Sequence, residues 1–305
     1  MHRGHSGDTE ERAAVIVQTT LEGVHTFEQP DGYVTHYRLW GAETAADLVV
    51  MLHGGMSHAG WQAPLGARLA ELGDDVAFLA VDLRGSGLNA VRGHIPDGDL
   101  AVRDIALLLG SLKEARPATR IHLAGWCFGA QVATVVAAGL ADREVLASLL
   151  MVCPGFFFND RYSDVLDRSI DAALEVVEEL GITVEPTRPF IKVPLRPTDF
   201  TDRAEWLAAI EDDKLKLSHV TVGTIDAWEA IAVKSETEYG RIGQLPVRAV
   251  FGTRDKLVDN DRVRTFLQSH PDLETHDLDT GHAVHFEETE ALTRLVAGFV
   301  AELKR

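Results

Sequence analysis

Short runs of apolar residues alternate with amphipathic stretches over most of the chain. Uninterrupted apolar runs predict strands that are buried on both faces of a parallel sheet. The stretches between them repeat apolar residues every three or four positions, which predicts helices. Regular alternation of the two indicates an α/β fold, a mostly parallel twisted sheet flanked by crossover helices. The predicted strands are residues 48–52, 76–81, 121–124, 145–152, 247–251 and 274–277, and the predicted helices are residues 62–72, 97–113, 130–139, 259–268 and 287–303.

Two parts of the chain break this alternation. Near the start, apolar and polar positions alternate on both sides of Pro30-Asp31-Gly32, which predicts an antiparallel hairpin of residues 24–29 and 33–39. After Pro154 no central strand is indicated, and helical patterns at 165–180, 203–210 and 215–233 are joined by a proline-rich segment. We therefore predict a disordered leader (residues 1–14), a core (residues 15–153 and 241–305) and an inserted helical cap, or lid (residues 154–240).

The pattern Gly125-x-Cys127-x-Gly129 stands between a predicted strand and a predicted helix. It has the spacing of a nucleophile elbow, with sulfur in the place of the usual serine oxygen. Glycines suit the flanking positions, because side chains there would clash with the adjacent strand and helix. The start of the helix favours negative charge, and hence the thiolate that attacks. The alternative interpretation is a buried, inert cysteine, and exchange of a natural serine for cysteine would leave the same pattern.

Composition and charge narrow the classes of function. The 305 residues are 46% hydrophobic and 25% charged, as in ordinary globular proteins. Lys and Arg number 29 against 47 Asp and Glu, and the resulting net charge of −18 argues against nucleic acid and anionic membranes as partners. Two cysteines, no secretory signal and no run of membrane-spanning length lead us to expect a cytoplasmic protein. We expect no cofactor and no metal, since no histidine or cysteine pair has ligand spacing.

Five short motifs follow one another along the chain: His53-Gly54-Gly55, Asp82-x-Arg84-Gly85-x-Gly87, Gly125-x-Cys127-x-Gly129, Gly252-x-x-Asp255 and Gly281-His282. Their order resembles the α/β-hydrolase family, specifically its capped, lysophospholipase-like or proline-iminopeptidase-like members. The resemblance extends from about residue 22 to the end of the chain, apart from the cap. The cysteine departs from most members and resembles dienelactone hydrolases and thioesterase-like enzymes of natural-product pathways. Dienelactone hydrolases are smaller and lack a cap, so that likeness is to the elbow only.

The family's chain order of nucleophile, acid and histidine implies a catalytic set of Cys127, Asp255 and His282. His282 would take the proton of the thiol and later protonate the leaving group, although it could also be a loop histidine packed under the closing helix. Asp255, at the end of a predicted strand, would hold the imidazole tautomer. Asp259 and Asp261 compete for this role, but they fit the cap and first turn of the next helix better.

An oxyanion hole requires two backbone N–H groups that point at the developing negative oxygen. The resemblance implies that one is the N–H of Phe128, directly after the nucleophile. The other would come from the loop after the first parallel strand, at Gly55 or Met56. Glycine in that loop permits close approach of the backbone to a substrate. The alternative is a simple turn that ends the strand.

The sequence leaves the roles of several other side chains open. Apolar cap residues line an acyl pocket or cement the cap to the core, and both uses suit the same side chains. Arg84 is expected to brace its loop through Asp82 or the backbone, and Cys153 to be a buried thiol at a strand end. His58 and His94 either contact substrate or are solvated loop residues. The candidate substrate-binding residues are Trp126, Phe157, Phe158, Trp206 and Trp228.

A thiol nucleophile forms a thioester with the acyl group, and thioesters react readily with amines and thiols. We therefore predict an enzyme of small-molecule or natural-product metabolism. We expect it to be a monomer or a homodimer. It would hydrolyse or transfer an activated acyl group (an ester, a thioester or a lactone) of a small molecule or a carrier-bound thioester. One alternative is a dienelactone-hydrolase-like lactonase, which would need a cationic anchor such as Arg84, Arg188 or Arg196. Another is a non-catalytic, ligand-binding homologue.

Overall fold

A computed structural model describes residues 23–304, so the predicted leader lies outside the described residues. Its centre is an eight-stranded sheet with the strand order β1-β2-β4-β3-β5-β6-β9-β10. The first two strands form the predicted hairpin, β2 is antiparallel to β4, and all other neighbours are parallel. The strands are β1 (Val24–Glu28), β2 (Val34–Trp40), β3 (Asp47–Leu52), β4 (Val76–Val81), β5 (Arg120–Trp126), β6 (Leu146–Val152), β9 (Val247–Gly252) and β10 (Leu273–Leu278).

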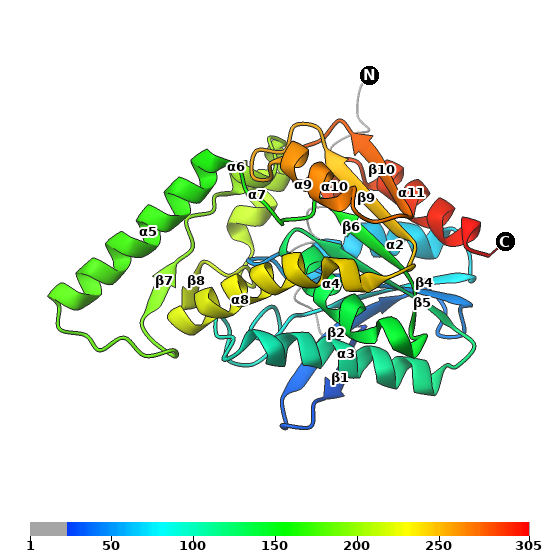
Figure 1. Ribbon diagram of the computed structural model, residues 1–305, viewed down its shortest axis with the longest axis horizontal. Helices are drawn as coiled ribbons and strands as arrows, with labels where there is room; N and C mark the ends of the chain where they lie inside the picture. The colour runs from blue at the N-terminus through cyan, green and yellow to red at the C-terminus, as the bar shows by residue number, and fades with distance from the viewer. Residues whose placement is uncertain (1–22, 305) are drawn as a thin grey trace, which may run out of the picture.

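Helices cover both faces of this sheet (Figure 1). On one face α2 (Ala63–Glu71) packs against α11 (Thr289–Glu302). On the other, α4 (Phe128–Leu140) packs between α3 (Gly98–Ala115) and α8 (Val222–Glu238). All six residues of β3 and all but one of α4 are buried, as expected for central elements that are apolar on every side. The predicted α/β class is confirmed. The remaining core elements are α9 (Asn260–Leu267), α10 (Val284–Glu287), η1 (Ala59–Gln62) and η2 (Ala141–Arg143), and η3 (Tyr239–Ile242) lies between α8 and β9.

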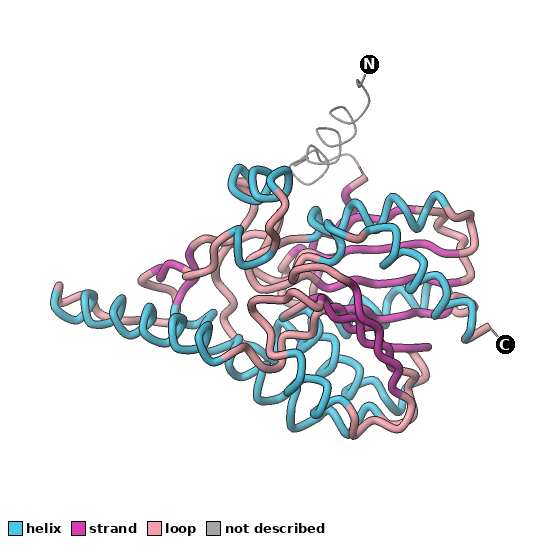
Figure 2. Tube along the Cα trace, turned by 90° about the horizontal axis from the view of Figure 1, so that it is seen from above, coloured by secondary structure: helices cyan, strands magenta, loops and turns pink. Residues whose placement is uncertain are grey.

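Between β6 and β9 the chain leaves the sheet, and we call residues 153–246 the insertion. It contains α5 (Asp160–Glu179), β7 (Phe190–Lys192), α6 (Pro197–Phe200), α7 (Ala204–Asp212), β8 (His219–Thr221) and α8. Figure 2 shows α5 projecting away from the sheet, while α8 packs on α3 and α4. The helix predicted to begin at residue 215 begins at Val222, because residues 219–221 pair with β7 in a separate antiparallel ribbon.

Candidate active site

Cys127 occupies the turn between β5 and α4. Its backbone is in the positive-φ region (φ 54°, ψ −121°), which is unfavourable for a residue with a side chain. Glycine is required on both sides. A Cβ on Gly125 would lie 2.3 Å from the carbonyl oxygen of Gly129, and one on Gly129 would lie 2.2 Å from that of Leu52. The strand, turn and helix of the elbow therefore form as its glycine spacing predicts, with the thiol 7% exposed.

His282 and Asp255 form a buried pair. The Nδ1 atom of His282 lies 2.7 Å from Oδ2 of Asp255, and neither side chain is exposed. The other carboxylate oxygen accepts the N–H groups of Leu257 (2.8 Å) and Val258 (3.1 Å), which fixes the orientation of the acid. Of the three candidate acids, Asp255 is therefore the one that contacts the histidine. Asp259 caps α9 instead, and Asp261 lies in the first turn of that helix.

The second ring nitrogen of His282, Nε2, is buried and has no hydrogen-bond partner among residues 23–304. Burial on its own lowers the pKa of His282. The neighbouring Asp255 and Cys127 side chains, through charge and hydrogen bonding, outweigh burial, so the pKa of His282 is raised above its ordinary value. Both side chains thus act on one imidazole, the carboxylate on the Nδ1 side.

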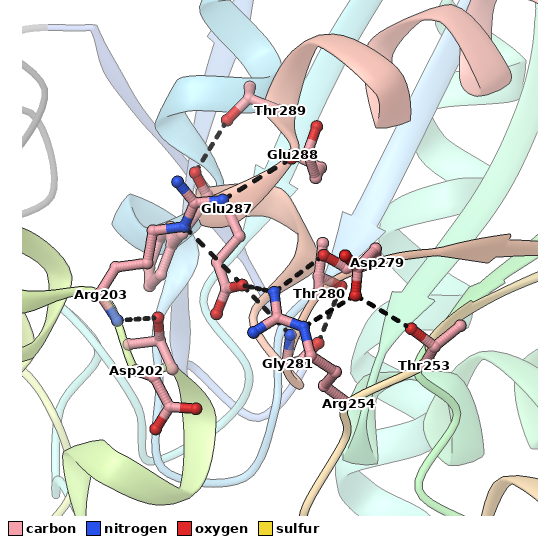
Figure 3. Close-up of polar contacts among 12 residues, drawn as sticks. Asp202, Arg203, Thr253, Arg254, Asp279, Thr280, Gly281, Glu287, Glu288 and Thr289 are labelled. Atoms are coloured by element: carbon pink, nitrogen blue, oxygen red, sulfur yellow. Dashed lines mark hydrogen bonds and ion pairs between the residues drawn. The ribbon is translucent and has the colours of Figure 1, made fainter.

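A network of charged side chains joins the loops that carry the acid and the histidine (Figure 3). Arg254 donates to Oδ1 of Asp279 (2.9 Å), to its carbonyl oxygen (2.8 Å) and to Oε2 of Glu287 (3.3 Å). The same Oε2 accepts the N–H of Gly281 at 3.2 Å, although the Glu287 side chain is only 1% exposed. The buried Glu287 carboxylate therefore holds both Arg254, which precedes Asp255, and Gly281, which precedes His282.

The loop after β3 approaches the cysteine from the other side. We call residues 53–62 the glycine loop. Within it, the carbonyl oxygen of Gly54 accepts Nδ1–H of His53 (2.7 Å) and both the N–H (3.2 Å) and Oγ–H (3.0 Å) of Ser57. Because C=O and N–H point in opposite directions across a trans peptide, the N–H of Gly55 points away from these partners. A Cβ on Gly54 would lie 3.3 Å from Cβ of Cys127, so the loop and the elbow are in close contact.

The tautomer of His53 follows from its partners. Its Nε2 accepts the N–H of Leu83 at 3.0 Å, so the proton is on Nδ1 and is donated to Gly54. Burial lowers the pKa of His53 to about 4, and the ring is therefore neutral at pH 7. This neutral histidine fixes the Gly54 carbonyl. Next to this peptide, the carbonyl oxygen of Met56 accepts the N–H of Leu217 at 2.8 Å.

A cavity of about 740 Å³ lies beside Cys127 and is lined by both the core and the insertion. Of the predicted substrate-binding residues, Trp126, Phe158 and Trp228 line it, as do Gly55, Met56 and Phe128. The prediction must be corrected for Phe157 and Trp206, which do not. Phe157 packs edge-on against Phe266, and Trp206 stacks on Phe286 at 4.7 Å. Both rings pack the insertion against the core. The sequence could not distinguish this packing role from that of a pocket wall.

Several other predicted side chains lie away from the cavity lining. Arg84 braces its loop, but through Asp104 (2.6 Å) and Asp31 (2.9 Å) and not through the predicted Asp82. The Asp82 carboxylate accepts Ala59 N–H of the glycine loop instead (2.7 Å). Two further candidate anchors for a lactonase, Arg188 and Arg196, are exposed and pair with the carboxylates of Glu185 and Asp199 within the insertion.

The sequence left the roles of His58 and His94 open, and both side chains have hydrogen-bond partners within the protein. His58 is 2% exposed, and its Nε2 lies 3.0 Å from Oδ2 of Asp213. The half-buried His94 contacts Oγ1 of Thr221 at 2.9 Å. Neither lines the cavity, and His58 is not the solvated loop residue that the sequence allowed, whereas His94 is partly exposed.

One group of side chains has ligand-like spacing among the described residues. Potential ligand atoms of Cys153, Asp255 and His282 lie within 4.8 Å of one another. They come from three strand ends far apart in sequence, which is why spacing along the chain did not reveal them. Burial raises the pKa of the Cys153 thiol well above its ordinary value, whereas a metal ligand must be a thiolate. These side chains are therefore better described as the hydrogen-bonded His282–Asp255 pair with the buried Cys153 thiol beside it.

The mostly parallel sheet, with Cys127, Asp255 and His282 following β5, β9 and β10, defines an α/β-hydrolase. Residues 43–289 match the family described as serine aminopeptidase, S33, and the chain belongs to this family. The elbow here carries cysteine where the family description names serine. None of the curated proteins compared with the sequence matches it. Among the helices of residues 23–304, none combines the length and apolarity needed to cross a membrane.

Solved structures share the fold at low sequence identity. A soluble variant of monoglyceride lipase from Saccharomyces cerevisiae superimposes with a TM-score of 0.77 at 16% identity, covering 94% of this chain and 97% of the other. A monoacylglycerol lipase from Paleococcus ferrophilus gives 0.69 at 18% identity, with 88% and 99% covered. A thioesterase domain of the curacin biosynthetic pathway gives 0.61 at 16% identity, with 90% and 98% covered. At these identities the likeness establishes the fold.

Proposed function

We propose that the protein is an enzyme that hydrolyses or transfers an activated acyl group through an acyl-cysteine intermediate on Cys127. The observation that carries the proposal is the buried His282–Asp255 hydrogen bond of 2.7 Å, together with the unpartnered Nε2 of His282 and its electrostatic coupling to Cys127. A base oriented by an acid and directed at a nucleophile is the arrangement that covalent acyl transfer requires. A binding protein has no need of it.

In the proposed mechanism, Nε2 of His282 takes the thiol proton and the sulfur of Cys127 attacks the carbonyl carbon of the substrate. The carbonyl oxygen becomes negative and accepts hydrogen bonds from the N–H groups of Phe128 and Gly55. Collapse breaks the bond to the leaving group, which receives the proton from His282. Water or another acceptor then gives its proton to His282, attacks the thioester and releases the acyl product with the thiolate as leaving group. Asp255 stabilises the imidazolium in both halves.

The cavity supports a neutral, lipophilic acyl group as substrate. Most of its lining side chains are aromatic or aliphatic, and 740 Å³ is large enough for a drug-sized ligand. Four carboxylates border it, Asp167 and Asp171 on α5 and Asp226 and Glu229 on α8. Together with a net charge of −18, they disfavour a polyanion. We propose that the insertion acts as the lid of this cavity.

Solved structures of this fold carry names that refer to monoglyceride lipase and thioesterase activity. Those names make carboxylic esters and thioesters the first substrates to test. The lactonase alternative receives less support, because none of its three candidate arginines lines the cavity. Lys192 is the single basic residue in the lining among the described residues, and it would be the anchor for a carboxylated ring.

The test is intact-protein mass spectrometry with p-nitrophenyl esters and N-acetylcysteamine thioesters, each with and without an added amine. We expect one acyl group on Cys127, and faster release to the amine if the enzyme is a transferase. The Cys153→Ala protein should be acylated as the parent is, and Cys127→Ala not at all. Turnover by Cys127→Ala at the parent rate would refute the acyl-cysteine mechanism. Rapid alkylation of Cys127 without acylation by any ester, thioester or lactone would favour the ligand-binding alternative.

A further inference from the structure

A turn of the insertion lies directly on the glycine loop. Oδ2 of Asp213 accepts the indole N–H of Trp61 at 2.7 Å and Nε2–H of His58 at 3.0 Å. Four residues further on, the N–H of Leu217 donates to the carbonyl oxygen of Met56 at 2.8 Å. The loop is therefore held by residues 213–217 at two places, on both sides of Ser57. The other carboxylate oxygen of Asp213 accepts the N–H of Leu215, which shapes the turn itself.

The direction of these hydrogen bonds is fixed by the donors. The indole of Trp61 can only donate. The Nδ1 atom of His58 accepts the N–H of Gly60 at 3.1 Å, so the proton of a neutral ring is on Nε2 and points at Asp213. The N–H of Leu215 is a third donor. An ionised carboxylate, with two oxygens and no hydrogen, satisfies all three donors at once.

In the environment of Asp213, an ionised carboxylate is unfavourable unless hydrogen bonds compensate for its burial. Its side chain is 0% exposed, and burial opposes ionisation. Hydrogen bonds from His58 and Trp61 outweigh burial and lower the pKa of Asp213 below its ordinary value. Trp61 is itself fully buried against Trp126, the residue before Cys127, with ring centroids 5.9 Å apart. The carboxylate thus sits where the insertion, the glycine loop and the elbow meet.

We propose that Asp213 is a positioning residue, which holds the glycine loop so that the Gly55 N–H faces the carbonyl oxygen of a substrate bound at Cys127. The insertion then contributes to the chemical step as well as covering the cavity. This inference rests on the proposed function of Cys127. It assigns a role in the reaction to a residue that touches neither the substrate nor the reacting atoms.

The test compares two reactions of the same thiol in Asp213→Ala. This change removes the carboxylate that accepts from Trp61, His58 and Leu215, so both side-chain hydrogen bonds to the glycine loop are lost. Acylation by a p-nitrophenyl ester passes through an oxyanion, and its rate constant should fall about 10- to 100-fold with a KM changed less than about threefold. Alkylation by iodoacetamide displaces iodide without an oxyanion, and its rate should stay within about twofold of the parent. Asp212→Ala, at the exposed neighbouring position, is the matched control and should change neither rate.

An equal fall of both rates in Asp213→Ala would mean that the residue only stabilises the fold, and unchanged acylation would refute its positioning role. If Asp213→Ala does not give the parent circular dichroism spectrum, Trp61→Phe removes one of the three donors and keeps an aromatic ring. It should show the same selective loss of acylation by about threefold to tenfold, and equal rates would again refute the role. Failure of the proposed function is distinguishable, because then the parent protein itself would alkylate but not acylate at Cys127.

Discussion

Glu287 accepts the backbone N–H of Gly281 at 3.2 Å, so a buried carboxylate six residues along the chain holds the residue that precedes His282. The same carboxylate binds Arg254, the residue that precedes Asp255. The two members of the histidine–acid pair thus share one support. It draws the loop after β9 and the loop after β10 together at the carboxyl edge of the sheet.

Replacing Glu287 should disturb both the fold and the proposed reaction. Glu287→Gln removes the charge that faces Arg254, whose side chain is 47% exposed and keeps Asp279 as a partner, and we expect a loss of about 1 to 2 kcal/mol in the free energy of unfolding. The rate of acylation should also fall, because the imidazole would be less well oriented. Glu288→Gln alters an exposed carboxylate 3.7 Å from Arg203 and should cost less than about 1 kcal/mol. Urea unfolding and acylation kinetics measure both effects. A Glu287→Gln protein as stable as Glu288→Gln would contradict the shared support.

The members of the proposed triad should differ in their importance. His282→Ala removes the base and should lower turnover as far as Cys127→Ala does, since such residues act as one unit. Asp255→Asn keeps the shape but loses the tautomer control and the charge, and we expect a fall of about 10⁴-fold or less. Asp259→Asn is the matched control, because asparagine caps a helix about as well as aspartate does. Steady-state turnover of a p-nitrophenyl ester gives the ranking. A larger effect at Asp259 than at Asp255 would reassign the acid.

Buried histidines should make the protein sensitive to mild acid. His285 is 0% exposed, neither ring nitrogen has a partner among the described residues, and burial next to His282 lowers its pKa to about 3. Between this value and the ordinary 6.5, the unfolded chain binds a proton that the folded chain does not. Stability therefore falls as the pH falls through this window, by up to about 1.4 kcal/mol per pH unit for one proton.

His285→Phe tests this pH dependence. The ring lies among aromatic neighbours, 4.4 Å from Trp126 and 4.1 Å from Phe286, so phenylalanine should fit. We expect unchanged or higher stability at pH 7, because two unpartnered polar atoms are removed. The slope of the free energy of unfolding between pH 4 and 6.5 should decrease by about one proton. Denaturant titrations at several pH values measure it. A slope equal to that of the parent would show that His285 is not the group responsible.

Trp228 should control which acyl groups fit beside the cysteine. Its ring lies 5.8 Å from that of Phe128 and against Gly55. Trp228→Ala should enlarge the cavity and shift kcat/KM toward bulky acyl groups over acetyl by at least about tenfold. Phe190→Ala, on an aromatic residue of the insertion that is 51% exposed and outside the cavity lining, is the control. A panel of p-nitrophenyl esters measures the preference. An unchanged preference would place the acyl group elsewhere in the cavity.

Local sequence determines most of the sheet and the elbow. The apolar runs became central strands because burial on both faces admits few other residues, and the elbow glycines are required by contacts of less than 2.5 Å. The pairing of His282 with Asp255 could be anticipated only through the family resemblance. Nothing near His58 or Trp61 indicates a partner more than 150 residues away in Asp213. The same limit applies to Phe157 and Trp206, since an apolar side chain looks alike in sequence whether it faces a cavity or a neighbouring helix.

The Gly54 carbonyl is held by three hydrogen bonds, all from residues of its own loop. A peptide group fixed in this way is preorganised, so the proposed donor at Gly55 needs little rearrangement to meet a developing oxyanion. The proposed reaction would then gain little selectivity from induced fit at the reacting carbonyl. Discrimination would come instead from how well an acyl group fills the cavity before the thiol attacks. Among acyl donors with the same leaving group, those that fill the cavity poorly should acylate Cys127 slowly yet without a lag.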